Sequence, residues 1–213
     1  MDFVANKDNY AELLELIAAR KFTYSGLIFA ENVDISELHV QNLYLEKLDV
    51  SKLIDLQVLD CTYNCLRHLD VRTCTKLKML MCANNHLTSL LVHSASYLDC
   101  ANNQLTSLQV IDYSRTYYLY IENNQITELI LPSAPIYTLN CSDNQLNKLD
   151  LSKLYWLNNL MATHNNLQEI EFHPDIHINT LLCNTKLLIV NNRQAQHIKS
   201  INRFWATIAI KIK

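Results

Sequence analysis

Glycine is almost missing from this chain: Gly26 is the only one among 213 residues. A protein of this length built from many unlike loops would need more, because glycine reaches left-handed backbone at no steric cost. The scarcity therefore favours an architecture in which one turn geometry recurs. Asparagine can serve such a turn, since it tolerates left-handed backbone and hydrogen-bonds its own main chain.

Long apolar runs are missing as well. The longest falls far short of a membrane span, so none is predicted. The N-terminal sequence MDFVANKDNYAELLELIAARK lacks the basic start and continuous apolar run of a secretory signal, and it is typical of an amphipathic helix. We therefore expect a cytoplasmic protein, or one exported without a Sec signal.

Acidic residues are missing from residue 191 onward, although the whole chain carries a formal charge of −3. The first 190 residues hold 13 basic and 21 acidic residues, and residues 191–213 hold five basic ones. We interpret this tail as a basic C-terminal cap, and docking on its own domain or on an acidic surface stays open. Five charges without an organised groove give only weak, salt-sensitive contact with nucleic acid, so no specific nucleic-acid binding is predicted.

Eight stretches of eleven residues align on one another, for example LQVLDCTYNCL and IYTLNCSDNQL. Their starts are spaced by 21, 21, 18, 21, 20, 21 and 21 residues. This period, with the shape LxxLxCxxNxL, is typical of a leucine-rich repeat, in which each repeat adds one short strand to a parallel sheet. The stretches begin at Ile35, Leu56, Leu77, Ala95, Thr116, Ile136, Leu157 and Ile178.

The predicted fold is a leucine-rich repeat solenoid with a curved parallel β-sheet on its concave face. Only about ten residues per repeat remain for the return path, so the convex face should hold short extended or 3₁₀ segments. We divide the chain into an N-terminal cap with an amphipathic helix (1–34), a solenoid of about eight repeats (35–190) and a basic C-terminal cap (191–213). Asn9 and Glu12 form a possible capping box for the helix. The C-terminal residues expected to cover the last repeat are Ile198, Ile201, Phe204, Trp205 and Ile208.

Within each stretch, position 4 is always leucine and position 9 is asparagine in six successive repeats. A buried row of amides can satisfy backbone groups where the strand turns, so these asparagines are interpreted as structural. Position 6 is filled in five repeats by cysteine, which as a thiol is a small apolar side chain. Parallel side chains make disulfide geometry poor, and we predict a ladder of free thiols, which fits a reducing compartment. No metal site and no cofactor are predicted.

The repeats resemble the bacterial leucine-rich repeats of the cysteine-ladder kind, with the pattern LxxLxCxxNxLxxLDLS. Such repeats occur in internalin-like surface proteins and in repeat proteins of intracellular bacteria. Internalin-like proteins carry a secretory signal and a wall anchor, and repeat effectors with ubiquitin-ligase activity carry a catalytic domain with a nucleophilic cysteine after the repeats. No secretory signal or wall anchor is recognised in this sequence. A catalytic domain of that kind is not expected either, since only about 25 residues follow Leu188 and none of them is cysteine. The resemblance implies a stand-alone binding module, such as a bacterial effector acting in a host cell cytoplasm.

Positions 3, 5 and 7 of each stretch should face the concave side. In repeats three to five these positions bring methionine and tyrosine side chains together, with carboxylates at the border, and the small Ala83 and Ala101 beside them should leave a depression. Aromatic side chains ringed by polar groups are the composition of interaction hot spots, and acidic neighbours favour a partner carrying Lys or Arg. The alternative is that the tyrosines only pack along an exposed sheet. The predicted binding residues are Asp60, Met79, Met81, Tyr97, Asp99, Tyr118, Tyr120 and Glu122.

No enzyme is predicted. Asp143 and His164 should lie side by side near Ser142, which is the composition of a nucleophile and base. An open sheet offers no oxyanion site, however, so we interpret the pair as coincidental. His173 and His177 have a spacing seen in metal sites, but no further ligands converge on them.

Two functions remain. The first is a non-catalytic protein-interaction module that binds a protein with a basic or mixed surface through the concave face. The second is a structural scaffold or self-associating repeat protein that uses its terminal repeats or its basic tail. A monomer is favoured.

Overall fold

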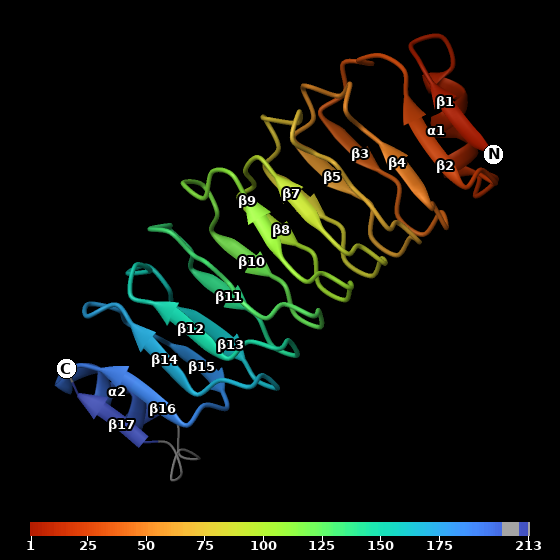
Figure 1. Ribbon diagram of the computed structural model, residues 1–213. Helices are drawn as coiled ribbons and strands as arrows, with labels where there is room; N and C mark the ends of the chain where they lie inside the picture. Colours follow the sequence, from red (N-terminus) through yellow and green to blue (C-terminus); the bar gives the residue numbers. More distant parts are fainter. Residues whose placement is uncertain (202–208, 213) are drawn as a thin grey trace.

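A computed structural model describes residues 1–201 and 209–212 of the chain. Its turns stack in chain order along one axis, with the two termini at opposite ends (Figure 1). The elements are β1 (Asp2–Ala5), α1 (Tyr10–Ala18), β2 (Gly26–Phe29), β3 (Glu37–His39), β4 (Lys47–Asp49), β5 (Val58–Asp60), β6 (Met79–Met81), β7 (Leu90–Val92), β8 (Tyr97–Asp99), β9 (Leu108–Val110), β10 (Tyr118–Tyr120), β11 (Thr138–Asn140), β12 (Lys148–Leu151), β13 (Asn159–Ala162), β14 (Glu169–Phe172), β15 (Thr180–Cys183), β16 (Leu187–Val190), α2 (Asn192–Ile201) and β17 (Ala209–Ile212).

The main sheet is a parallel sheet of eight strands in the order β15-β13-β11-β10-β8-β6-β5-β3, one from each predicted repeat. The prediction of a parallel solenoid is therefore confirmed. The position-4 leucines are in register across every pair of neighbouring strands, from Leu38 with Leu59 to Leu160 with Leu181. All eight leucines are buried, and they form the continuous apolar layer behind the main sheet.

The position-9 asparagines tie each turn to the one before it. The Asn124 side chain shows the pattern: its Oδ1 accepts a hydrogen bond from the backbone N–H of Leu105 at 2.9 Å, and its Nδ2 donates to the carbonyls of Cys100 at 3.0 Å and Ile121 at 3.1 Å. Leu105 and Cys100 belong to the preceding turn. An amide suits this place because it has both donors and an acceptor, which neither an acid nor an alcohol offers in that geometry. The structural interpretation of these asparagines is confirmed.

Left-handed backbone occurs one residue earlier, at position 8. Seven successive repeats have φ between 53° and 58° there. Asparagine fills four of these positions, but tyrosine, aspartate and histidine fill the others, so the turn does not depend on asparagine alone. Because the same strained turn repeats, each residue has a similar steric cost, and in six of the seven repeats an asparagine amide follows at position 9 and offsets it. The seven residues are Asn42, Tyr63, Asn84, Asn102, Asn123, Asp143 and His164.

The return side of the solenoid is extended and contains short parallel strands, which we call the second sheet. This second sheet consists of three separate groups of hydrogen-bonded strands, β1-β2-β4, β7-β9 and β12-β14-β16-β17. No 3₁₀ helix occurs within the described residues. The 18-residue repeat loses its residues from the loop that returns to the main sheet, since only residues 93–96 separate β7 from β8, whereas residues 50–57 separate β4 from β5.

The N-terminal segment differs from its prediction in two respects. It contains strands β1 and β2, which extend the second sheet beyond the repeats. The capping box is wrong, because Asn9 makes no side-chain hydrogen bond to the N-terminus of α1. Its Nδ2 donates instead to the Val4 carbonyl at 3.0 Å, and its Oδ1 accepts from the Asn6 N–H at 2.8 Å. The only glycine, Gly26, lies where a Cβ would come within 2.2 Å of Asp2 Oδ1, so a larger residue there would displace the Asp2 side chain.

A reciprocal capping box exists at the other end, at the start of α2. The Asn191 N–H donates to Gln194 Oε1 at 2.7 Å, and the Gln194 N–H donates to Asn191 Oδ1 at 2.9 Å. Ile198 of α2 is buried, and β17 pairs with β16, as the alternating sequence before the C-terminus indicates. Phe204, Trp205 and Ile208, which were expected to cover the last repeat, lie outside the described residues. Neither helix of the described part is long and apolar enough to cross a lipid bilayer.

All seven cysteines are free, and the predicted thiol ladder is confirmed. Cys61, Cys82, Cys100 and Cys141 are fully buried on the inner side of the main sheet. Burial in this apolar layer raises the pKa of each of these thiols, to about 12 for Cys141. The ladder is therefore chemically inert while the protein is folded.

Replacing Asn124 with alanine should destabilise the fold by roughly 3 kcal/mol, because it leaves buried N–H and C=O groups of two turns without partners. Chemical denaturation monitored by circular dichroism measures the change. Thr127→Ala, at an exposed position of the same turn, is the matched control and should have little effect. Equal stability of the two variants would contradict the role given to the amide.

Thiol labelling with a chromogenic disulfide reagent should separate the cysteines into two groups. Cys65 is only partly buried and should react in the native protein, whereas the five buried thiols and Cys183, whose pKa burial raises to about 12, should react only after denaturation. Mass spectrometry of the labelled protein identifies the sites. Rapid labelling of Cys82 or Cys100 in the native protein would show that the ladder is open to solvent.

Candidate functional site

The outer surface of the main sheet carries the predicted binding residues in two rows. Across neighbouring strands, Met79 pairs with Tyr97 and Tyr97 with Tyr118, while Met81 pairs with Asp99 and Asp99 with Tyr120. Asp60 precedes Met81 in the second row. These residues, with Glu122 two residues after β10, are called the sheet patch from here on. The register brings seven of the eight predicted residues onto the four neighbouring strands β5, β6, β8 and β10, and Glu122 follows the last of them.

Tyr97 contacts both of the other tyrosines of the sheet patch. The ring centroids of Tyr97 and Tyr118 are 6.1 Å apart, and those of Tyr97 and Tyr120 are 5.5 Å apart. Both pairs are tilted, by 42° and 44°. Tyr118 is 42% exposed and the other two rings are half-buried, so the cluster presents both apolar ring surface and phenol oxygens to solvent.

The carboxylates of the sheet patch have no cationic partner among the described residues. Asp60 Oδ1 accepts from the Thr62 hydroxyl at 2.7 Å, and Asp99 Oδ1 accepts from the Ala101 N–H at 3.1 Å. Glu122 Oε2 is sealed from solvent and accepts no hydrogen bond. Desolvation raises the pKa of Asp99, and the nearby Asp60 charge raises it further. The pKa of Glu122 is raised mainly by desolvation and also by the charges of Asp99 and Asp143.

Charge on this surface is of one sign. Positions 3, 5 and 7 of the eight repeats hold four carboxylates, Glu37, Asp60, Asp99 and Glu122, and neither Lys nor Arg. The ion pairs of lysine and arginine in the described residues lie elsewhere, as in Lys76 with Asp55 and Lys148 with Glu169. The sheet patch is therefore a partly desolvated acidic surface that an external cation can complement. Ala83 and Ala101, which were expected to leave a depression, are buried.

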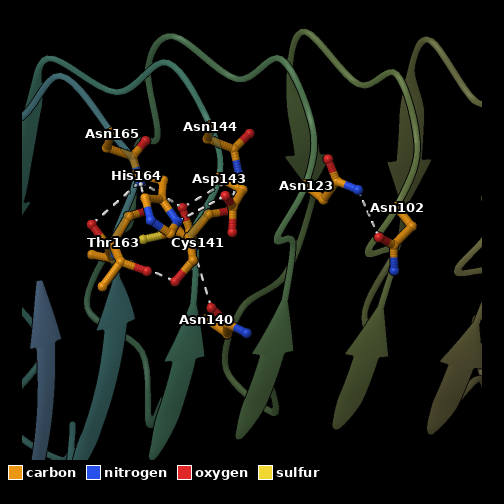
Figure 2. Close-up of polar contacts among 11 residues, drawn as sticks. Asn102, Asn123, Asn140, Cys141, Asp143, Asn144, Thr163, His164 and Asn165 are labelled. Carbon is orange, nitrogen blue, oxygen red and sulfur yellow. Dashed lines mark hydrogen bonds and ion pairs between the residues drawn. The ribbon is translucent and has the colours of Figure 1, made fainter.

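The turn at position 8 carries the Asp143–His164 pair (Figure 2). His164 Nδ1 and Asp143 Oδ1 are 2.9 Å apart, as the repeat alignment predicts, and both side chains are largely exposed. Ser142 is buried, and its Oγ accepts from the Thr163 N–H at 3.3 Å. The same row holds Asn102 and Asn123, whose side chains are joined by a 2.7 Å hydrogen bond. The pair thus belongs to a ladder of polar contacts between successive turns.

His173 and His177 point to different neighbours. The ring of His173 lies 5.8 Å from that of Tyr155, whereas His177 stacks on His197 of α2 at 4.3 Å. In the part of the chain that the structure describes, no group of three or more His, Cys, Asp or Glu side chains is placed to hold a metal ion.

A second aromatic cluster, missed by the sequence analysis, lies where the chain enters strands β10, β11 and β13. Tyr117 stacks on Tyr137 at 5.7 Å, Tyr137 contacts Trp156 at 5.9 Å, and Trp156 contacts Tyr155 at 5.2 Å. These four rings are between 36% and 48% exposed. With His173, which continues the row, they are called the edge stripe. The sequence signal was the recurrence of an aromatic residue at or just before position 2 of three successive repeats, which the strand alternation does not single out.

No protein-family model matches the sequence, and no curated protein sequence matches it. Solved structures do match. The functional domain of InlJ from Listeria monocytogenes, which includes a cysteine ladder, matches with a TM-score of 0.56 and 23% identity over 81% of this chain and 45% of that chain. A leucine-rich repeat protein from Leptospira interrogans gives a TM-score of 0.54 and 19% identity over 90% and 55% of the two chains.

A third match is the leucine-rich repeat domain of APL1B, with a TM-score of 0.50 and 13% identity over 93% of this chain and 75% of that one. The chain spans less than two thirds of either bacterial structure. These likenesses establish the fold: the chain is a leucine-rich repeat solenoid whose structural neighbours include bacterial repeat proteins, one of them with a cysteine ladder.

Glu122→Gln should stabilise the protein at pH 7, by up to about 1 kcal/mol after allowance for partial exposure, because it removes a poorly solvated charge. A carboxyl whose pKa is raised by folding binds its proton more tightly in the folded state. Stability should therefore rise as the pH falls through the window between the ordinary and the raised pKa of Glu122. Thermal unfolding of both chains at several pH values measures this. Glu128→Gln, at an exposed acid of the next return segment, is the control. A destabilised Glu122→Gln variant would contradict the unfavourable burial.

Proposed function

We propose that the chain is a non-catalytic protein-interaction module that binds a protein partner through the sheet patch. The carrying observation is that the partly exposed carboxylates of Asp99 and Glu122 have no cationic partner among the described residues, on a sheet surface that contains neither Lys nor Arg. A folded protein leaves a carboxylate partly desolvated and unpaired at a cost in stability, and such costs are concentrated where a ligand later supplies the partner.

The partner presents arginine or lysine. A guanidinium suits the sheet patch because it stacks on tyrosine faces and donates several hydrogen bonds to carboxylates. The tyrosine rings lie beside the acids: the charges of Asp99 and Glu122 both contribute to the raised pKa of Tyr97 and Tyr120, after desolvation. A cation bound there meets both ring faces and carboxylates, which supports recognition of a basic surface.

The setting of this interaction is a reducing compartment, such as the cytoplasm of the producing cell or of a host cell. The free, buried thiol ladder supports this, because disulfides are favoured in oxidising compartments and none of the seven cysteines is paired. The partly exposed Cys65 would be open to oxidation elsewhere.

The experiment is an affinity capture from cell lysates that compares the wild-type chain with Tyr97→Ser/Tyr118→Ser/Tyr120→Ser, followed by affinity measurement on the captured protein. Removing such an aromatic centre should weaken binding by more than about 2 kcal/mol. Circular dichroism establishes that the variant remains folded. A captured protein that binds both chains equally would place the binding surface elsewhere.

Charge reversal tests the electrostatic part. Asp99→Lys/Glu122→Lys should weaken binding of the captured protein by at least roughly tenfold and reduce its salt dependence. Glu128→Lys/Asp150→Lys makes the same charge change on the return side of the solenoid and should leave the affinity unchanged. Binding by the wild type should also weaken on acidification, starting at a higher pH than for an ordinary carboxylate, since protonation of Asp99 and Glu122 removes the attraction. Unchanged affinity after reversal at the sheet patch would refute a cationic partner.

A further inference from the structure

The edge stripe is a surface separate from the sheet patch. Its rings come from successive turns and touch in one unbroken row, Tyr117–Tyr137–Trp156–Tyr155–His173, with centroid separations of 5.2 to 5.9 Å. Neither the phenol oxygens of the three tyrosines nor the indole N–H of Trp156 has a hydrogen-bond partner among the described residues. A continuous row of exposed aromatic rings marks a binding site more often than isolated apolar residues do.

The backbone beneath the stripe is already paired. The Tyr117 N–H donates to the Ser96 carbonyl at 3.0 Å, the Tyr137 N–H to the Tyr117 carbonyl at 2.8 Å, and the Asn158 N–H to the Tyr137 carbonyl at 2.9 Å. A peptide that binds by adding a strand needs free N–H and C=O groups at a sheet edge. The backbone groups along the edge stripe are already paired with one another, so a ligand there must be recognised by the side chains.

Those side chains carry no formal charge. From Ser96 the row of backbone-paired residues continues with Tyr117, Tyr137, Asn158 and Asn179, without an Asp, Glu, Lys or Arg, and Lys78 pairs with Ser96 at the end of the row away from the rings. The side-chain amides of Asn158 and Asn179 make no hydrogen bond to other described residues, so their N–H donors and carbonyl acceptors are available to a ligand. This absence of charge is complementary to a neutral ligand rather than to nucleic acid or a charged peptide.

The nearest charges along the chain have other neighbours. Lys153 lines a hollow of about 260 Å³ on the second sheet together with Asp150. Arg115 lies close enough to Asp112 to contribute to the lowered pKa of that carboxyl, after the hydrogen bonds from Ser114. At the His173 end the Asp175 N–H donates to His173 Nδ1 at 3.1 Å, so one acidic residue borders the row, while the rings themselves carry no carboxylate, lysine or arginine.

We propose that the edge stripe binds a neutral, linear oligosaccharide. The C–H faces of pyranose rings pack against aromatic rings, and their hydroxyls exchange hydrogen bonds with amides and phenols, which are the two kinds of group present. Successive turns of a parallel solenoid repeat at roughly 4.8 Å, so a polymer of like units can engage several turns with the same contact. The site does not depend on the protein-binding role of the sheet patch, because no residue is shared.

The test is a fluorescence titration of the full chain with cellohexaose and with chitohexaose. We expect a saturable change in tryptophan emission with at least one of these oligosaccharides and none with glucose or N-acetylglucosamine at the same sugar concentration. The change should disappear in Trp156→Phe, in which Trp205 is the remaining tryptophan. Tyr137→Ser, which keeps the reporter, should weaken binding roughly tenfold, the loss expected for one stacking contact.

Tyr97→Ser/Tyr118→Ser is the matched control, since it removes two tyrosines from the sheet patch and should bind the oligosaccharide as the wild type does. Circular dichroism establishes the folding of each variant. No saturable response to either oligosaccharide, or a response to a polyproline peptide in their place, would overturn the proposal. Unchanged binding by Tyr137→Ser, or a loss shared by the control, would likewise remove the site from the edge stripe. These outcomes are independent of protein capture by the sheet patch.

Discussion

The hydrogen bonds of the buried asparagine amides are the interaction on which this fold depends. Each amide, as at Asn124, accepts from one turn and donates to two. The backbone polar groups of a sharp inward turn would otherwise be buried without partners, at a cost that no apolar side chain could offset. Because this bond recurs in each turn, it fixes the left-handed backbone at position 8 and the point where the return segment begins. The position-4 leucines of successive turns therefore stack in register. The same constraint explains how one glycine suffices.

A stack held in this way leaves two surfaces free for function. The outer surface of the main sheet is set by strand register alone, so residues 20 or so apart in sequence, such as Tyr97 and Tyr118, become neighbours. Its acids remain unpaired and partly desolvated. The edge where the chain enters the strands is set by the turn geometry and carries uncharged rings. Solenoids can thus present two surfaces of different chemistry on consecutive residues, as Tyr117 and Tyr118 do here.

The repeat period was enough to predict the parallel sheet, its register, the thiol ladder and the adjacency of the sheet-patch residues, because each follows from a residue type that recurs at a fixed interval. Features without a repeat were missed. Strands β1 and β2 lie before the first repeat. The rings of the edge stripe do not keep one repeat position, because Tyr117 and Tyr137 are at position 2 whereas Tyr155, Trp156 and His173 come before position 1. Asn9 satisfied the capping pattern, but tertiary contacts with Val4 and Asn6 captured its side chain. The unpaired state of Glu122 could not be foreseen, since it depends on which neighbours fail to reach it.

The central claim is that the main sheet's outer surface is the protein-binding surface. Hydroxyl-radical footprinting of the chain, alone and in complex with its captured partner, tests this most directly because tyrosine oxidation reports side-chain exposure residue by residue. Tyr97, Tyr118 and Tyr120 should be protected in the complex, while Tyr117, Tyr137 and Tyr155 of the edge stripe should oxidise as in the free chain. Protection of the second set without the first would contradict the account.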